Sequence, residues 1–244
     1  MQRPGAGRGR RIGVIILAVA LGVPALVGIA TAIGLAVTPP VDDLGKRVDA
    51  VLSAHGGARV PLARVPDQLS EALIAIEDER FYEHHGIDSQ GLLRAFFADL
   101  YHRRPLEGGS TLSQQLVKNL YMNHSDDGWR KPEDLVLALK LEARFGKHQI
   151  LESYLNSVYF GHGAYGIGQA ARVYFQMRPD ELDLARASML AGLPQSPSFY
   201  DLYHNPCAAR ARHFAVLAQM VHDGYISQDQ AAAAYQEAIG FPCP

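Results

Sequence analysis

The chain has 244 residues, of which 48% are hydrophobic and 20% are charged, and its formal net charge is -2 at pH 7. This length and composition give room for one ordinary folded domain with an appendage and exclude global disorder. A net charge this small also argues against a protein that binds nucleic acid through bulk positive charge, so we predict no nucleic-acid partner.

The N-terminal segment has the pattern of a membrane anchor. Residues 1–11 contain four arginines and no acid, and residues 12–37 contain no charged residue. Because about 20 apolar residues suffice for a helix to cross a bilayer, we predict a cytoplasmic basic tail at 1–11 and one transmembrane helix at 12–37. The arginines favour a cytoplasmic N-terminus, which places the rest of the chain outside the inner (cytoplasmic) membrane. The alternative is a cleaved signal peptide with an A-x-A site at 30–32, but its apolar region would be longer than the usual ~7–15 residues.

The segment after the anchor is weakly patterned. Residues 38–59 are rich in proline and glycine and are predicted to be a linker, and a short helix and a short strand are expected up to Val65. From Asp67 onward the hydrophobic spacing is helical almost throughout, so the domain at 60–225 is predicted to be mainly α.

The C-terminal segment, 226–244, is predicted to be a helix and a tail. Asn205-Pro206 is a helix start for the element before it, and an S-x-x-Q capping box at Ser227 opens the last helix, which is expected to end at Gly240. The two cysteines are Cys207 and Cys243. A disulfide that staples the tail and two unrelated thiols both remain open, and the spacing resembles no metal motif.

The helix expected from Asp67 carries an acid on its apolar side. Glu77 follows Leu73 by four residues, so it continues the stripe instead of facing solvent. Partial burial and the neighbouring acids raise the pKa of a carboxylate toward the range of a general base. The equally weighted alternative is that Glu77 pairs with an arginine or caps a neighbouring helix. The stripe consists of Leu69, Ala72, Leu73 and Ile76.

A second pattern is LEGGSTLSQQLVKNLYM at residues 106–122. Ser110 or Thr111 supplies a helix N-cap after a glycine-rich turn, and Thr111, Gln115 and Lys118 form one polar line on the helix that follows. Such a turn with a lysine on the same face suits a phosphate or another anion, although the Walker spacing is absent. The alternative is an ordinary capped amphipathic helix.

Two cations open the next expected helix. Arg130 and Lys131 lie at a helix start, where the helix dipole does not favour positive charge, so an anion clamp is one interpretation and exposed surface charge is the other. Residues 91–106 are bulky and apolar with basic edges, and they either enter a lipid headgroup layer or pack in the core.

The stretch GHGAYG at residues 161–166 matches the G-x-G-x-x-G pattern of dinucleotide-binding proteins. It follows a helical pattern instead of a strand, so the dinucleotide interpretation lacks its required context. A turn for close helix packing or for lining a substrate is favoured.

Taken together, several segments resemble the peptidoglycan glycosyltransferases of glycosyltransferase family 51, of the monofunctional, membrane-anchored kind. The resemblance covers about residues 60–225. Its motifs occur in the family's order as EDERFYEHHG, GGSTLSQQ, ILESYLNSVYFGHGAYGIGQAARVYF and LAGLPQSPSFY. The resemblance implies a lysozyme-like helical lobe with a smaller membrane-apposed lobe. It also implies polymerisation of lipid II by inverting transfer to a β-1,4 link, with undecaprenyl diphosphate as the leaving group.

The resemblance also assigns site residues. Glu77 matches the catalytic base, and Asp134 stands where the family has a second catalytic glutamate. Because aspartate is shorter by one methylene, its carboxylate lies about 1 Å further back, a displacement that matters to catalysis. The residues matching substrate-binding or site-positioning positions are Asp78, Phe81, His84, Ser110, Thr111, Gln115, Lys118, Arg130, Lys131 and Asn156.

The implied partners are lipid II, the growing glycan strand, the membrane and other cell-wall synthesis proteins. No cofactor is identified with certainty. Mg²⁺ or Mn²⁺ would suit the diphosphate, but the sequence shows no dedicated cluster of metal ligands. No transpeptidase motifs follow. Two rival functions remain, namely a lysozyme-like enzyme that cleaves glycan and a non-catalytic membrane-anchored protein that binds lipid II or a synthase.

Overall fold

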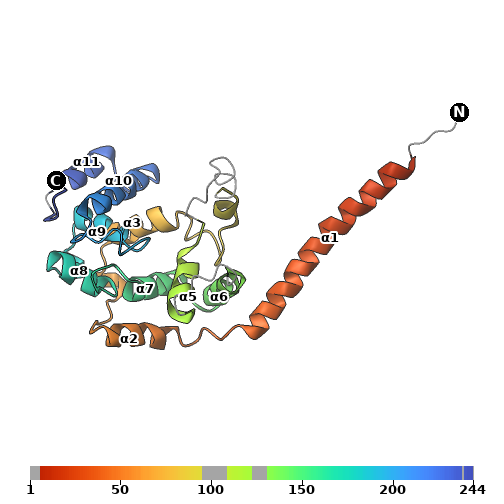
Figure 1. The fold of residues 1–244 in the computed structure, drawn as a ribbon, viewed down its shortest axis with the longest axis horizontal. Coiled ribbons are helices and arrows are strands. Elements are labelled where there is room, and N and C mark those ends of the chain that lie inside the picture. Colours follow the sequence, from red (N-terminus) through yellow and green to blue (C-terminus); the bar gives the residue numbers. More distant parts are fainter. Residues whose placement is uncertain (1–5, 95–108, 123–130, 238, 244) are drawn as a thin grey trace.

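The computed structural model describes residues 6–94, 109–122, 131–237 and 239–243, with side chains from residue 21 onward except that of Lys131. This part of the chain is mainly helical, and the only extended pairing in it is an isolated bridge between Tyr159 and Tyr165. The prediction of a mainly α fold is confirmed. Figure 1 shows a body of packed helices from which one long helix projects.

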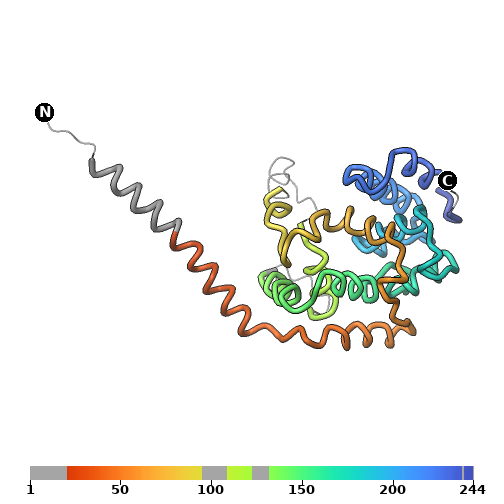
Figure 2. The backbone as a smooth tube through the Cα atoms, turned by 180° about the vertical axis from the view of Figure 1, so that it is seen from behind, coloured from red at the N-terminus to blue at the C-terminus, as the bar shows by residue number. Residues whose placement is uncertain are grey.

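The projecting helix is α1 (Ala6–Val37), whose last turns approach α6 (Lys131–Arg144), with Gly34 beside Val136. Both ribbon views place α1 and the C-terminus on opposite sides of the body (Figures 1 and 2). Across the described residues, no helix combines the length and the apolar character that a membrane crossing requires. The transmembrane helix at 12–37 stays a prediction.

The helices of the body pack in two groups. In the first, α3 (Asp67–Glu77) lies against α9 (Leu184–Ala191) and α10 (Pro206–His222), and α11 (Gln228–Gln236) covers α10. A short 3₁₀ turn, η2 (Pro179–Glu181), precedes α9. The C-terminal end of α3 points toward the second group of helices, and the candidate site lies at this junction.

In the second group, α5 (Leu112–Tyr121) packs against α6 and α7 (Lys147–Ser157), and α2 (Leu44–Ala54) covers α7 and α5. The two groups are joined through α8 (Ile167–Phe175), which contacts both α7 and α9. One continuous hydrophobic core runs through both groups, and each fully buried leucine in it contributes about 1.5–3 kcal/mol.

The predicted linker contains a helix that belongs to the body. Leu44, Val48 and Leu52 of α2 recur every four residues and are all buried in the core. Part of the segment at 38–59 is therefore packed against the domain instead of spanning open solvent.

The short strand expected before Val65 is wrong, because this segment forms an irregular stretch and the 3₁₀ turn η1 (Leu62–Arg64). The side chain of Asn156 accepts from the Val60 N–H at 2.7 Å and donates to the Val60 carbonyl at 2.8 Å. Glu152 accepts from the Leu62 N–H at 2.9 Å. Side chains of α7 thus satisfy the backbone groups that a second strand would otherwise pair.

The predicted helix starts near the C-terminus are confirmed. Asn205 accepts from the Ala208 N–H, and Ser227 forms a capping box with Gln230. The end predicted at Gly240 is wrong, since α11 stops at Gln236. A disulfide between Cys207 and Cys243 ties the tail back to the start of α10. The alternative left open by the sequence is thereby settled in favour of a bridge.

Candidate active site

Glu77 lies at the junction of the two helix groups. It is the last residue of α3, and its side chain is only 7% exposed. Gln115 of α5 donates to Oε2 at 2.8 Å, and Arg212 of α10 donates to Oε1 at 2.9 Å. Glu77 therefore occupies the apolar edge of α3, as predicted, and it is also paired with an arginine, while its role as a general base stays a prediction.

The environment of Glu77 pulls its pKa in both directions. Burial raises the pKa most strongly, the hydrogen bond from Gln115 and the charge of Arg212 lower it, and Asp78 raises it again. The net direction is upward from the ordinary value. A carboxylate with a raised pKa holds a proton more firmly than an ordinary glutamate, which suits a general base.

Two further hydrogen bonds hold the partners of Glu77 in place. The buried Tyr154 hydroxyl donates to Oε1 of Gln115 at 2.8 Å, so the amide of Gln115 must present its NH₂ group to Glu77. Arg212 also donates from Nε to the Gly192 carbonyl at 3.2 Å, which fixes its guanidinium at the end of α9. Neither Tyr154 nor Arg212 was identified from the sequence.

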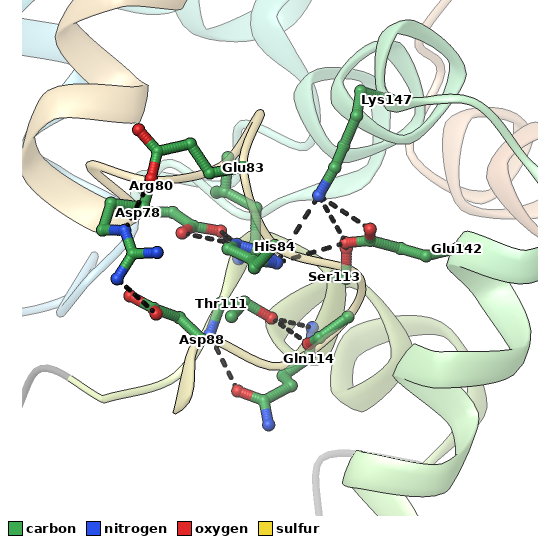
Figure 3. Close-up of polar contacts among 12 residues, drawn as sticks. Asp78, Arg80, Glu83, His84, Asp88, Thr111, Ser113, Gln114, Glu142 and Lys147 are labelled. Carbon is green, nitrogen blue, oxygen red and sulfur yellow. Dashed lines mark hydrogen bonds and ion pairs between the residues drawn. The ribbon is translucent and has the colours of Figure 1, made fainter. Parts of the chain in front are cut away.

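A second polar network begins at Asp78, the residue directly after Glu77 (Figure 3). Asp78 accepts from Nε2 of the buried His84 at 2.8 Å and from the Leu112 N–H, the first of α5, at 2.9 Å. A carboxylate at a helix N-terminus is favoured by the helix dipole. Asp78 therefore ties the chain directly after Glu77 to the start of the helix that carries Gln115.

The same network reaches α6 and α7. Glu142 accepts from the Ser113 hydroxyl at 2.5 Å and from the Lys147 ammonium at 2.8 Å. Nδ1 of His84 lies 3.5 Å from the Lys147 nitrogen, which in turn sits 4.5 Å from the centre of the Phe81 ring. Figure 3 shows these groups converging from separate segments of the chain.

Glu142 and Lys147 were missed at the sequence level, yet a signal for Glu142 exists. It follows the buried Ala138 by four residues, the spacing that singled out Glu77 after Leu73. Lys147 has no such signal, since its role depends on the fold bringing His84 beside it.

Thr111 is confirmed as the N-cap of α5. Its hydroxyl accepts from the Gln114 N–H in a capping box and donates to the Gly86 carbonyl at 2.8 Å. Gly86 has φ +88°, and a Cβ there would lie 2.9 Å from the Ala138 carbonyl oxygen. The glycine that ends EDERFYEHHG is therefore required by the close approach of α6.

The remaining predicted residues lie on several elements of the described chain or outside the described residues. Ser110 is exposed, and Lys118 and Asp134 are half-buried on α5 and α6. Asn156 is buried with both ends of its amide on the backbone of Val60. Arg130 and the side chain of Lys131 lie outside the described residues. Five of the predicted substrate-binding residues have buried side chains in this structure, namely Asp78, Phe81, His84, Thr111 and Asn156.

A buried glutamate held between an amide and a guanidinium is an arrangement suited to acid–base chemistry. The family model described as Transglycosylase matches residues 45–221. The protein named "Putative transglycosylase" from Cupriavidus necator is 40% identical over 185 residues, covering 76% of this chain and 80% of that protein. The chain therefore belongs to the transglycosylase family.

Penicillin-binding proteins are also similar to the chain. Penicillin-binding protein 1F of Bacillus subtilis is 39% identical over 194 residues, and penicillin-binding protein 1A of Escherichia coli is 41% identical over 180 residues. These matches cover 79% and 74% of this chain. The chain spans only 27% and 21% of the length of the two relatives.

Proposed function

We propose that the chain polymerises peptidoglycan glycan from lipid II. The observation that carries this proposal is the buried Glu77, with its raised pKa, in a chain of the transglycosylase family. Glu77 takes the proton from the 4-hydroxyl of the acceptor sugar, and the oxygen attacks the anomeric carbon of the donor. The bond to the diphosphate breaks with its electron pair, so the new β-1,4 link forms with inversion.

Gln115 and Arg212 orient the base. Each uses one oxygen of Glu77, so the carboxylate is held in one plane before substrate arrives. A preorganised base has no reorganisation cost at the moment of proton transfer. Asp134 is the proposed second carboxylate.

The buried network acts as a support for the base. Asp78 anchors the residue after Glu77 to the N-terminus of α5, and His84 and Lys147 extend that anchor to α6 and α7. We therefore assign the buried predicted residues a positioning role. We assign binding of the diphosphate to the cations implied by the resemblance, Lys118, Arg130 and Lys131. Negative charge builds on the leaving group during the reaction, and fixed cations stabilise that charge most in the transition state.

The proposal includes a membrane location. The donor is lipid-linked, and residues 12–37 carry no charge behind an arginine-rich tail, so α1 serves as a single-pass anchor that leaves the domain outside the inner membrane. Leu92 and Leu93, in the apolar segment with basic edges, are each more than half exposed, which supports a smaller lobe apposed to the bilayer next to a lysozyme-like lobe.

Incubation of the detergent-solubilised full chain with fluorescently labelled lipid II tests the proposal. We expect a ladder of glycan polymers on a gel, digestible by a muramidase. Cleavage of preformed glycan without polymerisation would instead support the lysozyme-like alternative. Binding of lipid II with neither product would support the non-catalytic one.

The charge of Arg212 gives a pH prediction. A base works only when ionised, so kcat/KM should fall as the pH drops through the pKa of Glu77, at a higher pH than for an ordinary glutamate. Arg212 lowers that pKa, so Arg212→Met is expected to move the acid limb of the pH profile to still higher pH. Arg210→Met is the matched control, because Arg210 lies on the same helix and bonds to the Tyr235 carbonyl. A profile that moves equally in both variants would contradict the assigned role.

A further inference from the structure

Three potential metal ligands meet on the surface, from two loops that are distant in sequence. His162 lies in the turn between α7 and α8, and Asp201 and His204 lie in the turn before α10. One ligand atom from each side chain lies within 4.8 Å of the other two. Oδ2 of Asp201 is 3.4 Å from Nδ1 of His162 and 3.2 Å from Nδ1 of His204.

The two separations from Oδ2 of Asp201 match those of ligands around one small cation. Zn²⁺ binds histidine nitrogen at about 2.0–2.1 Å and carboxylate oxygen at about 2.0–2.2 Å, so neighbouring tetrahedral ligands lie about 3.3–3.5 Å apart. Charge-assisted hydrogen bonds between a cationic N–H and a carboxylate are shorter, at about 2.7–2.9 Å. The spacing fits shared coordination better than two direct ion pairs.

The carboxylate is aimed at the histidines by its own hydrogen bonds. Oδ1 of Asp201 accepts from the N–H groups of Tyr203 at 2.9 Å and of His204 at 3.3 Å, which leaves Oδ2 toward the two rings. Asp201 is only 6% exposed, so its orientation is fixed by the surrounding protein. Partners of this kind hold ligands in place around metals.

The turn that carries His162 is also rigidly placed. His162 has φ 47°, in the left-handed region that few non-glycine residues adopt, between two glycines with positive φ. Its ring lies 4.4 Å from that of Tyr203, whose hydroxyl donates to the Val173 carbonyl at 2.8 Å. Phe241, in the tail tethered by the disulfide, packs against Tyr203 in an edge-to-face arrangement.

We propose that His162, Asp201 and His204 bind a transition-metal cation of the Zn²⁺ class. Two imidazoles and one carboxylate form a ligand set typical of Zn²⁺ when a fourth position stays open. The side chains of His162 and His204 are 40% and 73% exposed, so the fourth position faces solvent and takes water. The bound cation cross-links the turn before α8 to the turn before α10.

One other group in the described residues has ligand spacing, and it suits such a cation less well. It consists of Glu79, His222 and Asp223. Glu79 is already paired with Arg94 at 2.9 Å, and Gln219 donates to Asp223 at 2.9 Å. With only one imidazole, this group offers the oxygen-rich environment that Zn²⁺ favours less.

Zinc binding to the untagged, metal-stripped full chain in detergent tests the proposal, with a chromogenic chelator as competitor. We expect about one equivalent of Zn²⁺ and an affinity that is about tenfold or more weaker in His162→Ala and in His204→Ala. Asp201→Asn keeps the acceptor for the two N–H groups and should lose a similar factor. Substitution with Co²⁺ should give the strong visible absorption of a tetrahedral site.

His148→Ala and His222→Ala are the matched controls, since both remove a histidine outside the proposed site. Circular dichroism establishes that every variant keeps the helical content of the native chain. The proposal is overturned if the native chain binds no Zn²⁺, or if His222→Ala loses binding while His162→Ala retains it. Either result leaves the lipid II proposal untouched, because the metal measurement does not depend on polymerisation.

Discussion

A Glu77→Gln variant is expected to polymerise lipid II about 10²–10⁴-fold more slowly than the native chain, the usual contribution of general acid–base catalysis. Glutamine has nearly the same shape, so α3 and its packing stay intact. An amide is far too weak a base to take the proton of a sugar hydroxyl. Single-turnover rates with labelled lipid II separate this loss from any change in lipid II binding, which should be small because the amide oxygen of glutamine still accepts a hydrogen bond from the sugar hydroxyl.

Glu79→Gln is the matched control for this variant. Glu79 lies two residues further along, is partly exposed and pairs with Arg94 at 2.9 Å instead of with Arg212. Its rate should stay near that of the native chain. If Glu77→Gln kept native activity, the base would have to be another carboxylate, and Asp134 would be the next to replace.

The sequence singled out Glu77, the proposed base, because one local rule applied to it. An acid four residues after a buried leucine must point toward the core, whatever the rest of the fold does. The same rule, applied to Ala138, would have found Glu142. Arg212 obeys no such rule, because its contact with Glu77 joins residues 135 positions apart and depends on how α10 crosses α3.

The segment at 60–62 shows a different limit. A short strand is predicted before Val65, but the structure has an irregular stretch followed by the 3₁₀ turn at Leu62–Arg64, and no neighbouring strand pairs with it in the described residues. Asn156 and Glu152 present side-chain groups that pair with the backbone of Val60 and Leu62. Local propensity therefore did not determine the conformation of this segment, because its hydrogen-bonding partners are side chains that only the tertiary fold brings beside it.

The metal-ligand cluster was missed for the same reason. His162 and Asp201 are separated by the whole of α8 and α9, so no spacing in the sequence resembles a metal motif. The turn around His162 drew attention only through its glycines. Those glycines set the backbone that brings the imidazole to Asp201.

The second large effect is expected from Lys147→Met, which should destabilise the folded chain by about 3–5 kcal/mol or slightly less. Removal of one partner from a buried ion pair leaves an uncompensated charge. Glu142 is only 4% exposed, while Lys147 is 19% exposed, so some solvent screening of the pair remains. Methionine keeps most of the apolar length of the lysine over Phe81. Thermal unfolding in detergent measures the loss of stability for the full chain. Where a chain lacking residues 1–37 folds, its urea unfolding, followed by circular dichroism of the helices, measures the change in the free energy of unfolding.

Arg144→Met provides the comparison on the same helix as Glu142, because Arg144 pairs with Asp42 at 2.7 Å with both side chains about two-thirds exposed. An exposed pair contributes about 0–1 kcal/mol, so this variant should unfold almost as the native chain does. Adding Glu142→Gln to Lys147→Met should recover much of the lost stability, since the amide oxygen still accepts from Ser113 and the uncompensated charge of Glu142 is removed. If the double variant were as unstable as the sum of the single ones, the pair would not be coupled, and Lys147 would act by packing over Phe81. Recovery would instead establish that the charge of Glu142 is what requires Lys147, and that electrostatic interactions stabilise the network beside Glu77, the proposed base.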